Sequence, residues 1–236
     1  MVRRQRNRKR RRLRRWAKWA MICFACFVTV RISVFPKIHF NQEISTEQYE
    51  KAQEETQKEA VGYPEYVGNR IIYYNQEDPR WGEMTYGPVD RIADAGCGPT
   101  VLSMAVSSFT ENKLNPKEMC DWAYVNGYCS IGYGSFHTLI ANGLKQFGIE
   151  NTVTNNSREV EIALESGKPV IALMGEGHFT RGGHFILLCE MDANKKVIVA
   201  DPKSVERTMQ RWDFNTIAEE AKMSPAAGGA FWILDV

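Results

Sequence analysis

The chain has 236 residues, of which 44% are hydrophobic and 25% are charged, enough for one folded domain with extensions. Its formal net charge of +2 hides an uneven distribution of charges along the chain. Eleven Lys or Arg residues and no acidic residue lie between Arg3 and Lys18, whereas 17 basic and 28 acidic residues follow from Ile38 onward. The six cysteines and four histidines lack the close spacing of a zinc site, so we expect no metal and no cofactor.

The N-terminal segment has the pattern of a membrane-targeting sequence. A cationic stretch leads into the uncharged run "WAMICFACFVTV", which continues past Arg31 into "ISVF". The run is shorter than the about 20 apolar residues of a spanning helix, but Lys18 and Arg31 can extend it by snorkelling. The predicted organisation is a basic cytoplasmic head (1–18), a transmembrane signal anchor (19–35), a stalk or linker (36–69) and a folded domain (70–236).

Two alternatives to an anchor stay open. A cleaved signal peptide fits the short apolar core, although no small-x-small cleavage site follows it. A soluble basic arm would bind nucleic acid, but the apolar run argues against it, and we expect no nucleic-acid partner. With an anchor, the positive-inside rule leaves the N-terminus in the cytoplasm. The predicted localisation is therefore the cell membrane, single-pass, with the domain after about Pro36 outside the cell.

Hydrophobic periodicity in the folded domain places helices first and strands later. After a strand "RIIYYNQ" (70–76), amphipathic helical patterns cover 98–109, 115–127, 135–148 and 157–167. The second begins with a capping box formed by Asn115 and Glu118. Strand patterns then cover 168–174, 184–191, 196–201 and 230–236, interrupted by one short helix at 213–221. This order predicts the α+β class, with N-terminal helices packed on a mainly antiparallel sheet.

Cys97 lies in "DAGCGPTVL", at the start of the first long helix. A thiol at a helix N-terminus is exposed to the positive end of the helix dipole and to unpaired N–H groups, which favour the thiolate. Pro99 suits the first helical turn, and the flanking glycines leave room for a substrate backbone near the sulfur. The alternative is a structural cysteine in a tight turn.

His184 and Asp201 lie at the open end of a predicted β-hairpin. The two apolar runs of "GGHFILLCEMDANKKVIVADP" flank the turn sequence "DANKK", so His184 begins the first strand and Asp201 ends the second. With the turn near Ala193, the two residues are roughly opposite each other and project to the same face. A carboxylate in that place fixes the tautomer of an imidazole and stabilises its protonated form.

The other histidines are weaker candidates. His178 lies six residues before His184 in the glycine-rich loop "GEGHFTRGG" and stays an alternative base or substrate contact. His137 is expected to be a surface or packing residue, and His39 belongs to the juxtamembrane stretch. Gln76, in "YYNQEDPRW", is a candidate donor to an oxyanion, although one Gln before a loop says little alone.

The remaining cysteines have simpler interpretations. Cys23 and Cys26 are small hydrophobes of the apolar run, and Cys189 in "FILLCEM" is a core residue. Cys120 and Cys129 are nine positions apart, and outside the cell they are a possible disulfide.

Several motifs in this order resemble the standalone relatives of bacterial cysteine peptidases that process bacteriocin leaders: "YYNQEDPRW", "GCGPTVLSMAVS", "GKPVIALM", "GGHFILL" and "VIVADP". The resemblance covers residues 70–236. It implies a papain-like fold in which Cys97 is the nucleophile, His184 the base, Asp201 the residue that orients the base, and Gln76 a part of the oxyanion hole. The loop between Gln76 and Cys97 is long for that pattern. Export-coupled leader removal is not expected, because no ABC-transporter domain follows in this sequence.

The sequence thus predicts a membrane-anchored cysteine peptidase of the bacterial cell surface. Its partners would be a peptide or protein substrate and, through the anchor, the membrane. Amide transfer by the same four residues stays open. The rival hypotheses are a catalytically silent papain-like module that binds peptides, and a structural protein acting through its basic head or acidic stalk.

Overall fold

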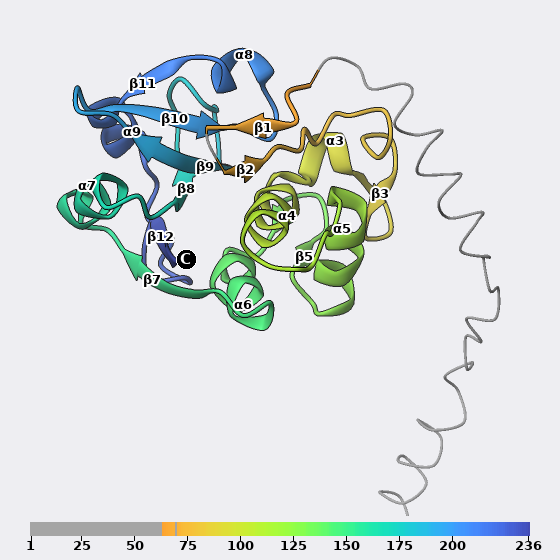
Figure 1. Cartoon of the computed structure of the whole chain (residues 1–236). Coiled ribbons are helices and arrows are strands. Elements are labelled where there is room, and N and C mark those ends of the chain that lie inside the picture. The colour runs from red at the N-terminus through yellow and green to blue at the C-terminus, as the bar shows by residue number, and fades with distance from the viewer. Residues whose placement is uncertain (1–62, 69) are drawn as a thin grey trace, which may run out of the picture. The chain divides into compact units, whose positions relative to one another are not determined.

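The computed structural model describes residues 63–68 and 70–236. Its centre is a six-stranded sheet in the order β11-β10-β9-β8-β12-β7, in which every pair of neighbours is antiparallel (Figure 1). In chain order the strands are β7 (Glu150–Thr154), β8 (Val170–Met174), β9 (His184–Met191), β10 (Lys196–Ala200), β11 (Arg211–Asp213) and β12 (Phe231–Asp235).

Helices cover both faces of this sheet (Figure 1). The core is divided into two buried clusters, one on each face of the sheet. In strand β8, Ile171 and Leu173 belong to one cluster, and Val170 and Ala172 belong to the other. Alternation of buried side chains is what a strand covered on both faces requires. The first cluster contains α4 (Cys97–Phe109), α5 (Pro116–Val125) and α6 (Thr138–Gln146), and the second contains α7 (Ser157–Glu165) and α9 (Phe214–Glu220).

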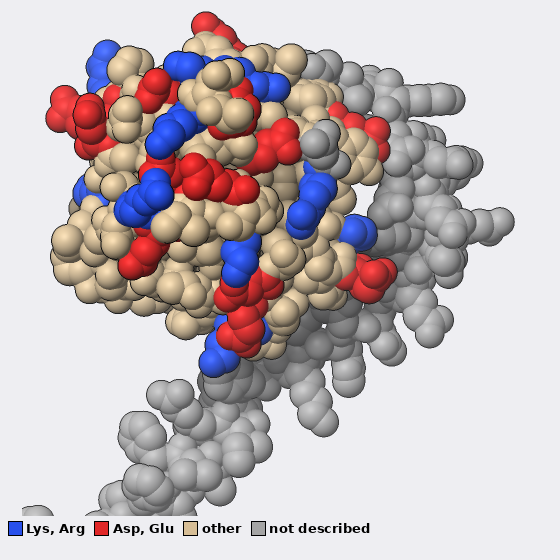
Figure 2. All heavy atoms as spheres, turned by 60° about the vertical axis from the view of Figure 1, so that its left-hand side comes forward, with Lys and Arg blue, Asp and Glu red and all other residues tan. Residues whose placement is uncertain are grey.

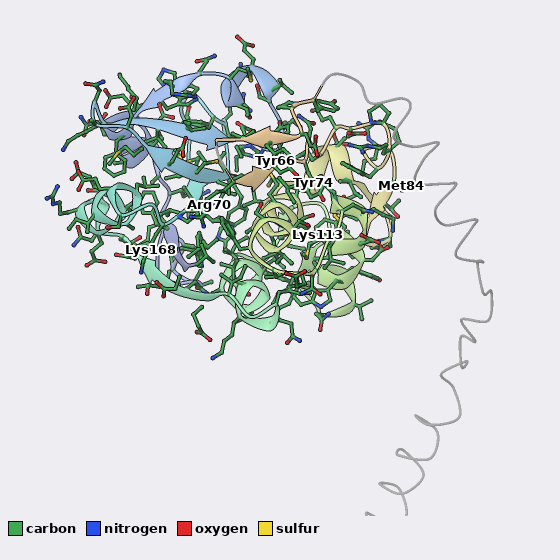
Figure 3. All side chains as sticks on the ribbon, in the orientation of Figure 1. Tyr66, Arg70, Tyr74, Met84, Lys113 and Lys168 are labelled. Atoms are coloured by element: carbon green, nitrogen blue, oxygen red, sulfur yellow. The ribbon has the colours of Figure 1, made fainter. Side chains whose placement is uncertain are left out.

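Short elements fill the connections. Arg70, labelled in Figure 3, lies between β1 (Tyr66–Val67) and β2 (Ile71–Ile72). Its Cζ lies 4.9 Å from the centroid of the Phe109 ring, so it holds the β1–β2 ribbon against the end of α4. These elements are β1 (Tyr66–Val67), β2 (Ile71–Ile72), β3 (Thr85–Tyr86), β4 (Asp90–Arg91), α3 (Ile92–Ala95), β5 (Cys129–Ser130), β6 (Gly134–Ser135) and α8 (Val205–Thr208).

The α+β class and the antiparallel sheet are confirmed, as are the four long helices and the four main strands. The Asn115–Glu118 capping box is also present. The strand predicted over 70–76 is shorter, because only Ile71–Ile72 pairs and the following side chains turn toward the β10–α8 loop. Strands β7 and β11, which form the two edges of the sheet, were not predicted from the sequence.

The turn between β9 and β10 is fixed by its own side chains. Asp192 Oδ1 accepts from the backbone N–H groups of Asn194 at 2.8 Å and Lys196 at 3.0 Å, and Lys195 has a positive φ of 59°. Glu161 of α7 pairs with both Lys195 and Arg158. Figure 2 shows basic and acidic side chains mixed in this way over the face toward the viewer. The hairpin is therefore tied to α7 at its closed end.

The predicted localisation, a single-pass cell-membrane protein with an extracellular domain, is contradicted. Within residues 63–68 and 70–236, no helix has the length and apolar character needed to cross a membrane. The longest described helix, α4, has 13 residues. At 1.5 Å per residue this is about 20 Å, short of the about 30 Å of a hydrocarbon core. The anchor predicted at 19–35 and the head at 1–18 lie outside the described residues.

The contact of α6 with α4 depends on a glycine. A Cβ at Gly143 would lie 2.4 Å from Leu102 Cδ2 in the core. We expect Gly143→Ala to destabilise the fold by about 1–3 kcal/mol, because overpacking outweighs the gain in helix propensity. Denaturant unfolding measures this, with exposed Asn142→Ala on the same helix as the control. An unchanged unfolding free energy for Gly143→Ala would contradict the packing argument.

Candidate active site

Cys97 is the first residue of α4, the helix that packs against β9. Its side chain is partly exposed, whereas Gly98 and Pro99 are buried. A Cβ at position 98 would lie 3.0 Å from Ser135 Oγ, so glycine permits the close approach of the β6 segment to the first turn. The thiol is thus held where N–H groups of a helix lack intrahelical partners.

His184 begins β9, and Asp201 directly follows β10. In the ladder Ala200 is opposite Leu187, so continuing the register places Asp201 two positions from His184 and on the same face. The side chains meet, with His184 Nε2 lying 2.8 Å from Asp201 Oδ1. Both are buried, at 4% and 0% exposure.

The thiol of Cys97 is a hydrogen-bonding partner of the His184 side chain. Because Nε2 faces Asp201, the nitrogen left for the thiol is Nδ1, on the other side of the ring. The structure therefore brings Cys97, His184 and Asp201 together in one chain of contacts, sulfur to imidazole to carboxylate.

The pKa values of this group favour an ion pair. Burial alone raises the pKa of Cys97, but the hydrogen bond and charge of His184, with N–H groups of Phe185 and Gly98, outweigh it and lower that pKa. Burial alone lowers the pKa of His184, but the hydrogen bonds and charges of Asp201 and Cys97 raise it from 6.5 to about 9. Each partner therefore favours the charged form of the other, the thiolate of Cys97 and the imidazolium of His184.

Asp201 is surrounded by donors that were not predicted from the sequence. Its Oδ1 also accepts the Lys203 backbone N–H at 2.8 Å, and its Oδ2 accepts Arg207 Nε at 2.5 Å. The backbone carbonyl of Asp201 accepts the Tyr73 hydroxyl at 2.7 Å. Burial raises the pKa of Asp201, but His184 and Arg207 outweigh it and keep that pKa below its ordinary value. The only sequence signal was a Ser204 cap three residues before Arg207.

Gln76 lies at this junction, with 1% of its surface exposed. Its backbone N–H donates to Pro202 O at 2.6 Å, and its Nε2 donates to Ala93 O at 2.6 Å, with Ile92 O at 3.4 Å. Its Oε1 is buried without a partner among the described residues. Exchanging the two amide atoms would set two oxygens 2.6 Å apart, so Nε2 belongs on the Ala93 side. The structure thus joins Gln76 to the turn that precedes Cys97.

The other described histidines form hydrogen bonds with residues outside the group formed by Cys97, His184 and Asp201. His178 is exposed and pairs through both its ring and its backbone N–H with Glu220 of α9. His137 is the residue just before α6 and makes no capping hydrogen bond with its side chain; its Nδ1 lies 2.8 Å from Ser224 Oγ, and burial lowers its pKa. His39 lies outside the described residues.

The described thiols are all free, including Cys120 and Cys129, so the possible disulfide is not formed. Cys189 is buried, as expected of a core residue. The described part of the chain holds no group of three or more His, Cys, Asp or Glu side chains arranged for a metal ion.

A thiol at the head of a central helix, facing a histidine on an antiparallel sheet, defines the papain-like cysteine peptidase fold. Residues 69–225 match the model of the Peptidase_C39 like family, and the chain belongs to that family. No curated protein matches the sequence.

Two solved structures are similar to the chain. One is the peptidase domain of Streptococcus ComA, a bifunctional ABC transporter of a quorum-sensing pathway, with 15% identity, a TM-score of 0.43, and coverage of 71% of this chain and 98% of that domain. The other is a double glycine motif protease from an AMS/PCAT transporter in complex with the leader peptide, with 13% identity, a TM-score of 0.43, and coverage of 70% and 91%.

The pH response of Cys97 follows from its contacts. Because Asp201 and Cys97 together raise the pKa of His184 to about 9, the imidazolium that stabilises the thiolate is present below that pH and is lost as the pH rises through it. Asp201→Asn should lower the pKa of His184 and raise that of Cys97. At pH values below the thiol pKa, alkylation of Cys97 by iodoacetamide should slow about tenfold for each pH unit by which that pKa rises. Peptide mass spectrometry measures the rate at Cys97.

The control for this variant is Asp235→Asn, since Asp235 pairs with Lys168 at the surface. Its profile should match that of the wild type. Equal alkylation rates for Asp201→Asn and the wild type across pH 5–9 would contradict the ion-pair description.

Proposed function

We propose that the protein is a cysteine peptidase that hydrolyses peptide or amide bonds, with Cys97 as nucleophile, His184 as acid and base, and Asp201 orienting His184. One observation carries this proposal, the continuous contact from thiol to imidazole to buried carboxylate at the N-terminus of α4. Membership of a peptidase family supports a peptide or protein as the substrate class.

The proposed reaction begins with the Cys97 thiolate attacking the carbonyl carbon of the scissile bond. His184, protonated at Nδ1, gives that proton to the leaving amine as the C–N bond breaks. Water, deprotonated by the now neutral His184, then attacks the thioester and releases the acid product and the thiolate. Asp201 holds the ring through Nε2 in both steps and stabilises its protonated form.

The negative oxygen formed during attack needs hydrogen-bond donors. The first turn of α4 supplies backbone N–H groups, including that of Cys97, and the helix dipole favours negative charge there. Gln76 is the proposed side-chain donor. Its Nε2 carries two N–H groups, of which one serves Ala93 O. The other has only the long contact to Ile92 O, so it is the one that we assign to the oxyanion.

A silent binding module would need none of this arrangement. The burial of His184 and Asp201 disfavours their charged forms, and the surrounding donors outweigh that penalty. Retention of a lowered thiol pKa in a partly exposed position favours a reacting cysteine.

Replacing the nucleophile tests the proposal. Cys97→Ala should abolish hydrolysis of a quenched fluorescent peptide library, because no other group in the site can form the thioester. The melting temperature should change little, since the side chain is partly exposed. Cys129→Ala, at a second partly exposed thiol, should retain full activity. Hydrolysis by a folded Cys97→Ala protein would overturn the assignment.

Replacing Gln76 tests the oxyanion role. Gln76→Ala should lower kcat about 10²–10³-fold, the usual cost of removing one oxyanion donor. Alkylation of Cys97 should be nearly unaffected, because that reaction develops no oxyanion. Exposed Gln210→Ala is the control. An equal loss of alkylation and hydrolysis would mean that Gln76 only holds the turn before Cys97.

A further inference from the structure

The buried carboxylate of Asp201 is shared between two positive groups. Oδ1 faces His184 Nε2 at 2.8 Å, and Oδ2 faces Arg207 Nε at 2.5 Å. We propose that Arg207 is a positioning residue whose charge, acting through Asp201, sets the pH range in which Cys97 is a thiolate. This inference rests on the proposed function.

Arg207 is held from several sides. It lies in α8, whose N-cap Ser204 accepts the Arg207 N–H at 3.1 Å. Its carbonyl accepts Trp212 Nε1 at 2.9 Å, and its side chain is 25% exposed. Thr208, the next residue, accepts the Asp201 N–H at 3.0 Å through Oγ1. The short helix therefore wraps back onto Asp201, and the direction of the guanidinium is fixed by backbone contacts.

The charges of the site balance only when Arg207 is counted. Thiolate, imidazolium and carboxylate together carry one net negative charge, and the guanidinium makes the group neutral. A net charge in a buried site is costly, and each additional negative charge there is disfavoured. Without Arg207, the thiolate is therefore harder to form, and the imidazolium is harder to deprotonate.

The titratable groups nearest Cys97 include Tyr86 and Cys120, and burial raises the pKa of each, so both stay neutral over the relevant range. Tyr73 and Lys203 contact Asp201. Tyr73 faces Asp201, and burial raises the pKa of Tyr73 to about 12, so it is neutral over the relevant range. The ammonium of Lys203 turns away from the carboxylate, toward Ala93 O at 3.1 Å and Glu77 Oε1 at 3.4 Å. Within the described residues, the basic side chains that contact the Asp201 carboxylate are therefore those of His184 and Arg207.

The test is the alkylation rate of Cys97 by iodoacetamide in the full chain between pH 4 and 10, followed by mass spectrometry. Arg207→Met removes charge and donor, Arg207→Gln removes the charge but keeps a donor, and Arg207→Lys keeps the charge. Arg211→Met, at an exposed arginine four residues further on, is the matched control.

In Arg207→Met and Arg207→Gln we expect the whole profile to move to higher pH. At pH values below the thiol pKa, alkylation should fall about threefold to tenfold, which corresponds to a thiol pKa higher by about 0.5 to 1, and it should converge with the wild type at high pH. Arg207→Lys should restore most of the wild-type profile, and Arg211→Met should match it.

Three results would overturn the inference: an unshifted profile in both neutral variants, a uniform loss of rate at every pH, or the same shift in Arg207→Lys as in Arg207→Met. If Arg207→Met fails to fold by circular dichroism, Arg207→Gln decides alone. Failure of the proposed function looks different, because the wild-type protein would then hydrolyse no peptide, whatever the alkylation profiles of the Arg207 variants.

Discussion

The contact between a thiol on a helix and an imidazole on a strand is the interaction on which the site depends. Cys97 and His184 come from different layers of the fold, and they meet because α4 packs on β9 and both residues lie at the first position of their element. Neither group alone has unusual chemistry. Together, their hydrogen bond and opposite charges lower the pKa of the thiol and raise that of the histidine, which favours an ion pair.

That ion pair exists in a buried place only because the charges behind it are satisfied. Asp201 has no exposed surface, yet each of its carboxylate oxygens accepts a donor on the side away from His184. An unpaired carboxylate there would protonate and stop supporting the imidazolium. The loop after β10 and the short helix α8 thus hold the Asp201 side chain in place. The site therefore includes residues beyond Cys97, His184 and Asp201.

The sequence was sufficient for most of the fold and for predicting that Cys97, His184 and Asp201 come together. Long periodic segments such as α4 and β9 are specified by their own buried faces, and the hairpin turn at Asp192 aligned His184 with Asp201. The edge strand β11 was missed because it has only three residues, and β7 was missed because its sequence, ENTVT, is mostly polar, so its alternation is not one of hydrophobic residues. Arg207 was missed for another reason: its role depends on how a four-residue helix directs it, which no periodicity encodes.

Gln76 contacts both sides of the candidate site, through its backbone and through its side chain. Its backbone N–H holds the Asp-Pro segment and its amide holds the turn before Cys97, so one residue fixes the carboxylate side and the thiol side of the site relative to each other. The unpartnered Oε1 is the cost of that arrangement, since a buried acceptor without a donor destabilises the fold. A glutamine fits there because its amide presents N–H groups, one of which donates to Ala93 O. A leucine would lack that donor, and a glutamate would set a negative charge against the Ala93 carbonyl.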